Sequence, residues 1–234
     1  GTTDTPRKDL AREPDAFDEE LEFILTEASQ ALSRPVRRED IKSLWVGLRP
    51  LVAAPAAAEG GTKVLSREHT IVVDANGLVT VTGGKWTTYR AMAEDVLERC
   101  FASQLLPRRA GGQSAAHVLR GAAVVSPATP LHVGPGLHLY GSDSARVTDC
   151  PGASNVLGAG LTEAMVRYAA RFEHAQTVED VLARRSRVLF LDAASAAQLA
   201  PAVAEILVQE LGADPALPSF LDLCTRYLPA TNAV

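Results

Sequence analysis

The sequence has few cysteines, few aromatic residues and no long hydrophobic run. Its three cysteines, Cys100, Cys150 and Cys224, are far apart and in no metal-ligand spacing. This pattern favours small buried thiols in a reduced, cytosolic-type compartment over a disulfide framework, and it predicts no metal site. No apolar segment approaches the roughly 18 residues of a membrane span. The opening residues, GTTDTP, do not resemble a signal peptide.

Excess positive charge is also missing. The 234 residues carry a net charge of -5, and the two basic clusters, RPVRRED and LARRSR, have acidic residues beside them. We therefore expect no nucleic-acid partner and interpret both clusters as solvated helix faces. No G-x-G-x-x-G motif is present, so the sequence contains no dinucleotide-binding βαβ signature. Because the first residue is Gly1, we expect a piece of a longer protein.

Hydrophobic residues make up 47% of the chain, which predicts a packed core. In the first part, apolar spacing predicts a helix over 18–32, with Asp15 or a neighbouring acid as its cap. Alternation from Ser43 predicts a strand that ends at Pro50. Residues 70–73 and 78–82 predict a hairpin around Asn76-Gly77, and a helix follows over 89–101.

The composition shifts at LLPRRAGGQS, which predicts a boundary between domains at 1–103 and 104–234. Beyond it the pattern is helical. Thr177 and Asp180 form a capping-box signature, and Asp192 and Gly212 are the expected start and stop of a long helix. Pro201 inside that segment predicts a kink or two consecutive helices. The predicted fold class is α+β: helix, strands, hairpin and helix, followed by an all-α second domain.

The stretch TVTGGKWTTYR carries the clearest functional pattern. It predicts a strand that passes through Gly83 and Gly84 into a helix, with Lys85 at the junction. Amide groups at a helix start favour an anion, and Thr87 and Thr88 add hydroxyls. The phosphate-binding P-loop does not match, because Trp86 replaces the required Ser or Thr. The alternative is a tight turn in which the glycines only supply backbone angles.

Two arginines are further candidates. Arg49, at the end of the predicted strand, and Arg67, in LSREHT, suit bidentate recognition of a phosphate or carboxylate. A surface salt bridge is the alternative role for Arg49. The histidines fall in no ligand-like spacing, and no Ser/His/Asp or Cys/His arrangement is found.

Taken in order, GTTDT, SLWVGLRPLV, SREHTIVV and GLVTVTGGKWTTYRAMAE resemble the FAD-dependent glycerol-3-phosphate dehydrogenases. The helical tail, with LYGSDSARV and LTEAMVRYAARFEHAQTVEDVLARRSRVLFLDA, resembles the C-terminal domain of the same family. The resemblance spans most of the chain, apart from the weakly patterned residues between Gln104 and Leu137.

This resemblance implies an oxidoreductase that converts sn-glycerol 3-phosphate to dihydroxyacetone phosphate, passing electrons through FAD to a membrane quinone. It places Gly83, Gly84 and Lys85 beside the flavin ring, where the following helix would stabilise negative charge at the N1/C2=O edge of the reduced flavin. The remaining family positions serve the substrate: Arg49 and Arg67 at its phosphate or hydroxyls, and Thr2 and Thr3 in the turn that lines its pocket. The family's dinucleotide-binding N-terminal part lies outside this chain, so we expect the isolated chain to be inactive.

Two alternatives remain open at this point. A related oxidase would pass electrons to oxygen, and the helical tail could instead be an interaction or membrane-docking module. A homodimer is also compatible with the sequence. The expected location is cytoplasmic, with peripheral contact on the inner face of the cell membrane.

Overall fold

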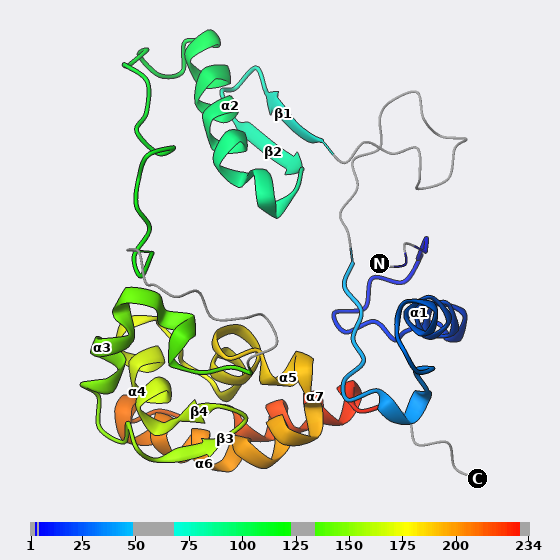
Figure 1. Cartoon of the computed structure of the whole chain (residues 1–234). Helices are drawn as coiled ribbons and strands as arrows, with labels where there is room; N and C mark the ends of the chain where they lie inside the picture. Colours follow the sequence, from blue (N-terminus) through cyan, green and yellow to red (C-terminus); the bar gives the residue numbers. More distant parts are fainter. Residues whose placement is uncertain (1–2, 4, 49–67, 123–133, 230–234) are drawn as a thin grey trace. The chain divides into compact units, whose positions relative to one another are not determined.

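The protein is described by a computed structural model that covers residues 3, 5–48, 68–122 and 134–229 (Figure 1). Contacts divide the chain into two compact units. Unit 1 comprises residues 1–14 and 47–117, and unit 2 comprises residues 15–46 and 118–234. The structure thus groups residues 15–46 with the helical part of the chain. The predicted domain boundary near residue 104 stays a prediction.

Unit 1 contains a hairpin and one long helix. Strands β1 (His69–Val73) and β2 (Val79–Gly83) pair antiparallel, with Ile71 opposite Val81. The turn between them is closed by hydrogen bonds from the Asp74 amide to the Leu78 carbonyl (2.9 Å) and from the Leu78 amide to the Asn76 side chain (3.0 Å). A short 3₁₀ turn, η3 (Trp86–Thr88), leads into α2 (Tyr89–Ala102), which contacts β1. The predicted hairpin and helix are confirmed.

Unit 2 is a helical assembly around one hydrophobic core. Its N-terminal elements are α1 (Asp18–Ala31) and η1 (Arg38–Asp40). The remaining elements are η4 (Leu137–Asp143), α3 (Ser144–Thr148), β3 (Val156–Gly158), β4 (Leu161–Thr162), α4 (Glu163–Phe172), η5 (Asp180–Arg185), α5 (Val188–Leu191), α6 (Ala193–Leu211) and α7 (Leu217–Tyr227). Helix α6 packs against both α4 and α7.

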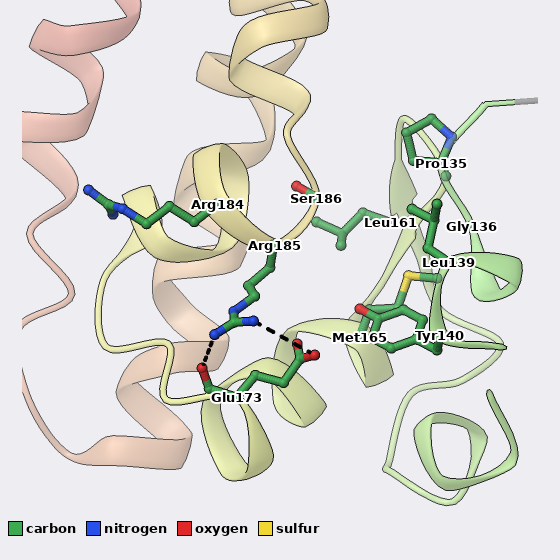
Figure 2. Close-up of a pocket in the computed structure, with 11 residues that line it drawn as sticks. Pro135, Gly136, Leu139, Tyr140, Leu161, Met165, Glu173, Arg184, Arg185 and Ser186 are labelled. Carbon is green, nitrogen blue, oxygen red and sulfur yellow. Dashed lines mark hydrogen bonds and ion pairs between the residues drawn. The ribbon is translucent and has the colours of Figure 1, made fainter. Parts of the chain in front are cut away.

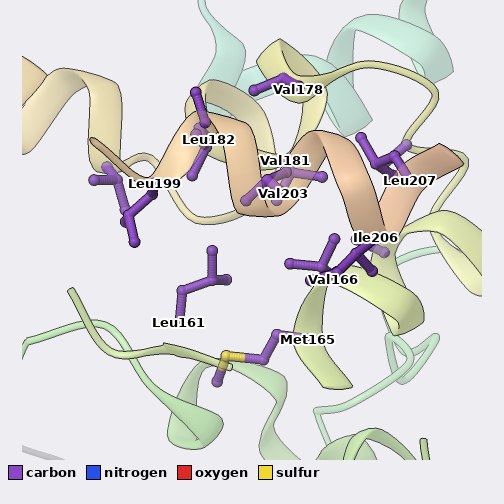
Figure 3. Packing of buried hydrophobic residues seen from close by; sticks show 14 of the residues in the cluster. Leu161, Met165, Val166, Val178, Val181, Leu182, Leu199, Val203, Ile206 and Leu207 are labelled. Carbon is purple, nitrogen blue, oxygen red and sulfur yellow. The ribbon is translucent and has the colours of Figure 1, made fainter. Parts of the chain in front are cut away.

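Figure 3 shows the centre of this core, where side chains of α4, η5 and α6 converge. Val166, Val181 and Leu207 are fully buried in it. Full burial of a side chain of this size contributes about 1.5–3 kcal/mol. All three cysteines are free and buried, and burial raises the pKa of the Cys224 thiol to about 11. This thiol is therefore protonated at neutral pH, as a packing residue would be.

Side-chain caps fix the helix ends of unit 2. Thr177 and Asp180 form the predicted capping box, since the Thr177 hydroxyl accepts from the Asp180 amide (3.1 Å) and the Asp180 carboxylate accepts from the Thr177 amide (3.0 Å). Asp192 accepts from the Ser195 amide (2.9 Å) at the start of α6. Gly212 ends α6 in the left-handed conformation (φ 65°). α6 runs through Pro201 as one helix, so the alternative of two consecutive helices is wrong.

Other local predictions need correction. The residue before α1 is Phe17, with no side-chain cap, because the acids of this region lie inside the first turn instead. They complement the helix dipole there. The short hairpin of β3 and β4 was not predicted, although the mixed α+β class with a helical C-terminal region holds. Within the described ranges, no helix combines the length and the hydrophobicity needed to cross a bilayer.

Residues 41–48 are not in a strand, contrary to the sequence-based expectation. Residues 41–46, which belong to unit 2, form a segment whose hydrogen bonds go to helices of the same unit. The Ser43 hydroxyl donates to the Leu189 carbonyl (2.7 Å), and the Leu44 amide donates to the Tyr227 carbonyl (2.8 Å). The Trp45 ring meets Phe190 edge to face at 5.0 Å. The alternating pattern therefore reflects docking onto helices and not pairing in a sheet.

Candidate functional site

The glycine turn that joins β2 to the helix has the predicted strand-to-helix geometry. Gly83 (φ 76°) and Gly84 (φ 83°) are both left-handed, a conformation that side chains with a Cβ rarely adopt. A Cβ on Gly84 would also lie 2.7 Å from the Met92 sulfur and 3.0 Å from the His69 Cβ. The second glycine is therefore required for the turn to pack against α2 and β1.

Lys85 precedes the helical segment in an extended conformation (φ -125°, ψ 143°). Its side chain is exposed, and no carboxylate among the described residues forms an ion pair with it. Trp86 and Thr87 begin the helical segment, so their amides lie where a helix leaves donors without helical partners. The Thr88 amide and hydroxyl both reach the Lys85 carbonyl at 3.0 Å. Lys85 and Thr87 therefore remain available to a ligand.

Sequence reasoning missed the residues that hold this turn in place. His69 Nε2 lies 2.9 Å from the Asp95 carboxylate, which ties β1 to α2, and His69 is also opposite Gly83 in the hairpin register. The hairpin register and the helical spacing of Asp95 together are the signal that could have found this pair. The exposed ring of Trp86 stacks on Tyr89, with centroids 5.6 Å apart.

The other predicted site residues are only partly described. Thr2, Arg49 and Arg67 lie outside the described residues, so the structure does not place them. Thr3 is half-buried in an irregular segment of unit 1. The structure thus brings together Gly83, Gly84, Lys85, Thr87 and Thr88 and leaves the predicted substrate residues as predictions.

The turn has the chemistry of an anion-binding site. A helix start contributes a partial positive charge of about half an elementary charge, and the exposed ammonium of Lys85 adds a full one beside it. Backbone donors, hydroxyls and an ammonium suit an oxygen or ring nitrogen that gains negative charge during reaction. No group of three or more metal-ligating side chains is found in the part of the chain that the structure describes.

Comparison with known proteins identifies the class of the helical unit first. Residues 132–217 match the family model of the C-terminal domain of alpha-glycerophosphate oxidase. This match covers α3 to α6 and the start of α7. Residues 132–217 therefore form a C-terminal domain of the glycerol-3-phosphate oxidase and dehydrogenase type.

Its relatives are mitochondrial glycerol-3-phosphate dehydrogenases. The chain is 35% identical to one from Arabidopsis thaliana over 240 residues (90% of the chain, 38% of the relative). It is 34% identical over 238 residues to those of Bos taurus and Homo sapiens (92% of the chain and 32% of the relative in both). The chain thus spans about a third of the length of these relatives. Their mitochondrial location overturns our expectation of a cytoplasmic protein at the inner face of the cell membrane.

Proposed function

We propose that this chain is one part of a flavoenzyme that oxidises sn-glycerol 3-phosphate to dihydroxyacetone phosphate and passes the electrons through FAD to a quinone. The observation that carries the proposal is the turn at Gly83, Gly84 and Lys85. It presents an exposed ammonium, without an ion pair among the described residues, at a helix start. The substrate is inferred from the relatives, which are glycerol-3-phosphate dehydrogenases.

The residues at this turn fit the electron-rich edge of a flavin. Lys85 and the helix start provide positive potential, and Thr87 offers a hydroxyl and an amide. The His69–Asp95 pair and the close contact between Gly84 and Met92 fix the turn before any ligand binds, so little ordering is needed on binding. FAD bound at this turn would supply the hydride acceptor for oxidation of the substrate.

The substrate side of the site is proposed from the sequence. Arg49 and Arg67 would bind the phosphate dianion through charge-assisted hydrogen bonds, and Thr2 and Thr3 would line the pocket. Gly83 and Gly84 would form the left-handed turn that brings the backbone to the flavin. Lys85 would act at the flavin and not at the phosphate, because it sits at the helix start.

The proposal is tested by flavin content. Since the chain spans about a third of its relatives, we propose that most flavin contacts come from the rest of the longer protein and that the isolated chain is inactive. The longer protein should purify with stoichiometric FAD, and the isolated chain should be folded and colourless. Absorbance spectra with circular dichroism check both. A longer protein that binds no flavin would refute the proposed function.

Oxygen is the second candidate acceptor, because the matching domain family is that of an oxidase. Rapid mixing of the reduced longer protein with oxygen or with a soluble quinone analogue separates the two. We expect the reduced protein to be reoxidised faster by the quinone analogue than by oxygen. The opposite order would show that the protein is an oxidase.

A further inference from the structure

Unit 2 contains a small pocket that is separate from the glycine turn (Figure 2). Its volume is about 130 Å³, and it lies between η4, β4, the end of α4 and η5. The apolar part of the wall is formed by Leu139, Leu161 and Met165. The polar part is formed by Tyr140, Glu173 and Arg185.

Two features show that the pocket walls are held in place. A Cβ on Gly160 (φ 77°) would lie 1.7 Å from the Pro135 carbonyl oxygen, so only glycine allows these two wall segments to meet. The Tyr140 ring rests edge to face on Tyr168, with centroids 5.5 Å apart, and the Tyr168 hydroxyl donates to the Asp143 carboxylate (3.2 Å). The position of the Tyr140 ring is therefore fixed by its contact with the buried Tyr168.

The polar groups of the pocket are incompletely satisfied by the described part of the protein. The Tyr140 hydroxyl has no hydrogen-bond partner there, and the Glu173 carboxylate accepts none. The Arg185 guanidinium donates to the Glu173 backbone carbonyl (2.5 Å), while it is 4.0 Å from the Glu173 carboxylate. Figure 2 shows the carboxylate directed toward Tyr140 and Met165, and Arg184 pointing away. Arg184 instead pairs with Asp180 (2.7 Å).

Burial shifts the pKa of both Tyr140 and Glu173. It raises the pKa of Tyr140 well above its usual range, so the phenol remains a neutral donor at physiological pH. It also raises the pKa of Glu173, an effect that Arg185 opposes. The lining contains the Glu173 carboxylate and the guanidiniums of Arg184 and Arg185. Glu179 and Asp180 balance the charge of Arg184, which leaves the lining close to neutral. An ion entering the pocket would therefore lose hydration without a full opposite charge to replace it.

We propose that this pocket binds a small neutral polyol. Its hydroxyl groups would donate hydrogen bonds to the Glu173 carboxylate and accept one from the Tyr140 hydroxyl, and its carbon chain would contact Leu161 and Met165. The volume is enough for roughly four water molecules at ~30 Å³ each, and a three-carbon polyol fits this space. Drug-sized ligands occupy pockets of about 300–1,000 Å³, so a whole flavin is too large for this pocket. This pocket would therefore be a site additional to the proposed flavin site.

The test is an amide NMR titration of the full chain with glycerol as the probe. We expect saturable shifts confined to residues around Tyr140, Gly160 and Glu173, with a dissociation constant in the millimolar range. Tyr140→Phe removes only the hydroxyl and should weaken binding at least about threefold. Tyr89→Phe, which alters an exposed tyrosine of unit 1, is the matched control and should bind as the wild type does.

Two further measurements make the outcome decisive. Glu173→Gln keeps the size of the side chain and should also weaken glycerol binding, and an unchanged melting temperature in each variant shows that folding is intact. Acetate and methylammonium should bind more weakly than glycerol. Shifts that do not saturate, equal affinity in Tyr140→Phe, or tighter binding of either ion would overturn the proposal.

Discussion

At the scale of single residues, Gly84 and Lys85 in the glycine turn have different roles: the fold requires the glycine but does not require the lysine. Gly84 has an internal reason to be glycine, because its backbone is left-handed and its missing Cβ faces Met92 and His69. Lys85 has no such reason, since its side chain is exposed and makes no ion pair with a described residue. The residue that carries the charge is thus the one that the fold does not need. This contrast points to a role for Lys85 toward a ligand.

Replacing Gly84 tests the structural half of this argument. Gly84→Ala should destabilise unit 1 by about 2–5 kcal/mol, since the left-handed backbone costs about 1–2 kcal/mol and overpacking about 1–3 kcal/mol. Chemical denaturation followed by circular dichroism measures the change. Gly111→Ala is the matched control, because no atom lies within 4 Å of its added Cβ. Equal effects of the two substitutions would contradict the packing role of Gly84.

Replacing Lys85 tests the functional half. In the longer enzyme, Lys85→Met should slow flavin reduction roughly tenfold to a hundredfold, the effect of one lost charge-assisted interaction. Folding should be unchanged because the side chain is exposed. Rapid-mixing absorbance with glycerol 3-phosphate gives the rate, and Lys8→Met, also at an exposed lysine, is the control. A rate equal to that of the control would remove Lys85 from the chemistry.

Arg49 is tested through substrate affinity. We expect Arg49→Ala to raise KM for glycerol 3-phosphate about tenfold or more in the longer enzyme, because a phosphate dianion would lose a charged hydrogen bond. Steady-state kinetics measure the change, with the exposed Arg12→Ala as control. An unaltered KM would assign Arg49 to a structural role.

At the scale of elements, the sequence correctly predicted the helices and the hairpin whose formation depends on residues close together in the chain. Asp192 and Gly212 bound α6 as expected, because a side-chain cap and a left-handed glycine act within a few residues. The predicted strand from Ser43 failed because its backbone partners, Leu189 and Tyr227, are more than 140 residues away along the chain. For the same reason, the hairpin register that aligns His69 with the turn could be predicted, but the side chains around the Tyr140 pocket could not.

The cap of α6 gives a prediction at this scale. Asp192→Ala should cost about 1 kcal/mol of unfolding free energy at neutral pH, the usual value of a lost N-cap. Asp192→Asn should cost less, since asparagine also caps helices and only the exposed ion pair with Lys42 (3.2 Å) is lost. Thermal or urea unfolding of the three proteins measures both differences.

The loss of stability in Asp192→Ala should depend on pH. The hydrogen bond from the Ser195 amide, ahead of the contact with Lys42, lowers the pKa of Asp192 below its unfolded value. The stabilisation by the charged cap is therefore fully present above about pH 4 and is lost as pH falls through the folded pKa. The gap between wild type and Asp192→Ala should shrink in acid. A gap that widened below pH 4 would contradict this assignment.

At the scale of the whole molecule, the two units differ in how much they bury. In the described part of unit 1, Cys100 is the only buried residue, and the sheet of this unit has two strands. Unit 2 has a continuous core that joins α4, α6 and α7. A two-stranded hairpin is marginally stable in water by itself, so the stability of unit 1 rests on few contacts. This difference matters because the proposed flavin residues lie in unit 1.

We therefore expect the two units to open with different free energies. Native-state hydrogen exchange measured by mass spectrometry should show faster exchange in β1, β2 and α2 than in α4 and α6, because local opening of unit 1 exposes little apolar surface. Met92→Ala, which removes the side chain against Gly84, should speed exchange in unit 1 alone. Val203→Ala, at a fully buried site in α6, should speed exchange in unit 2 alone. If either substitution changed exchange in both units equally, the two units would unfold together, which would contradict this prediction.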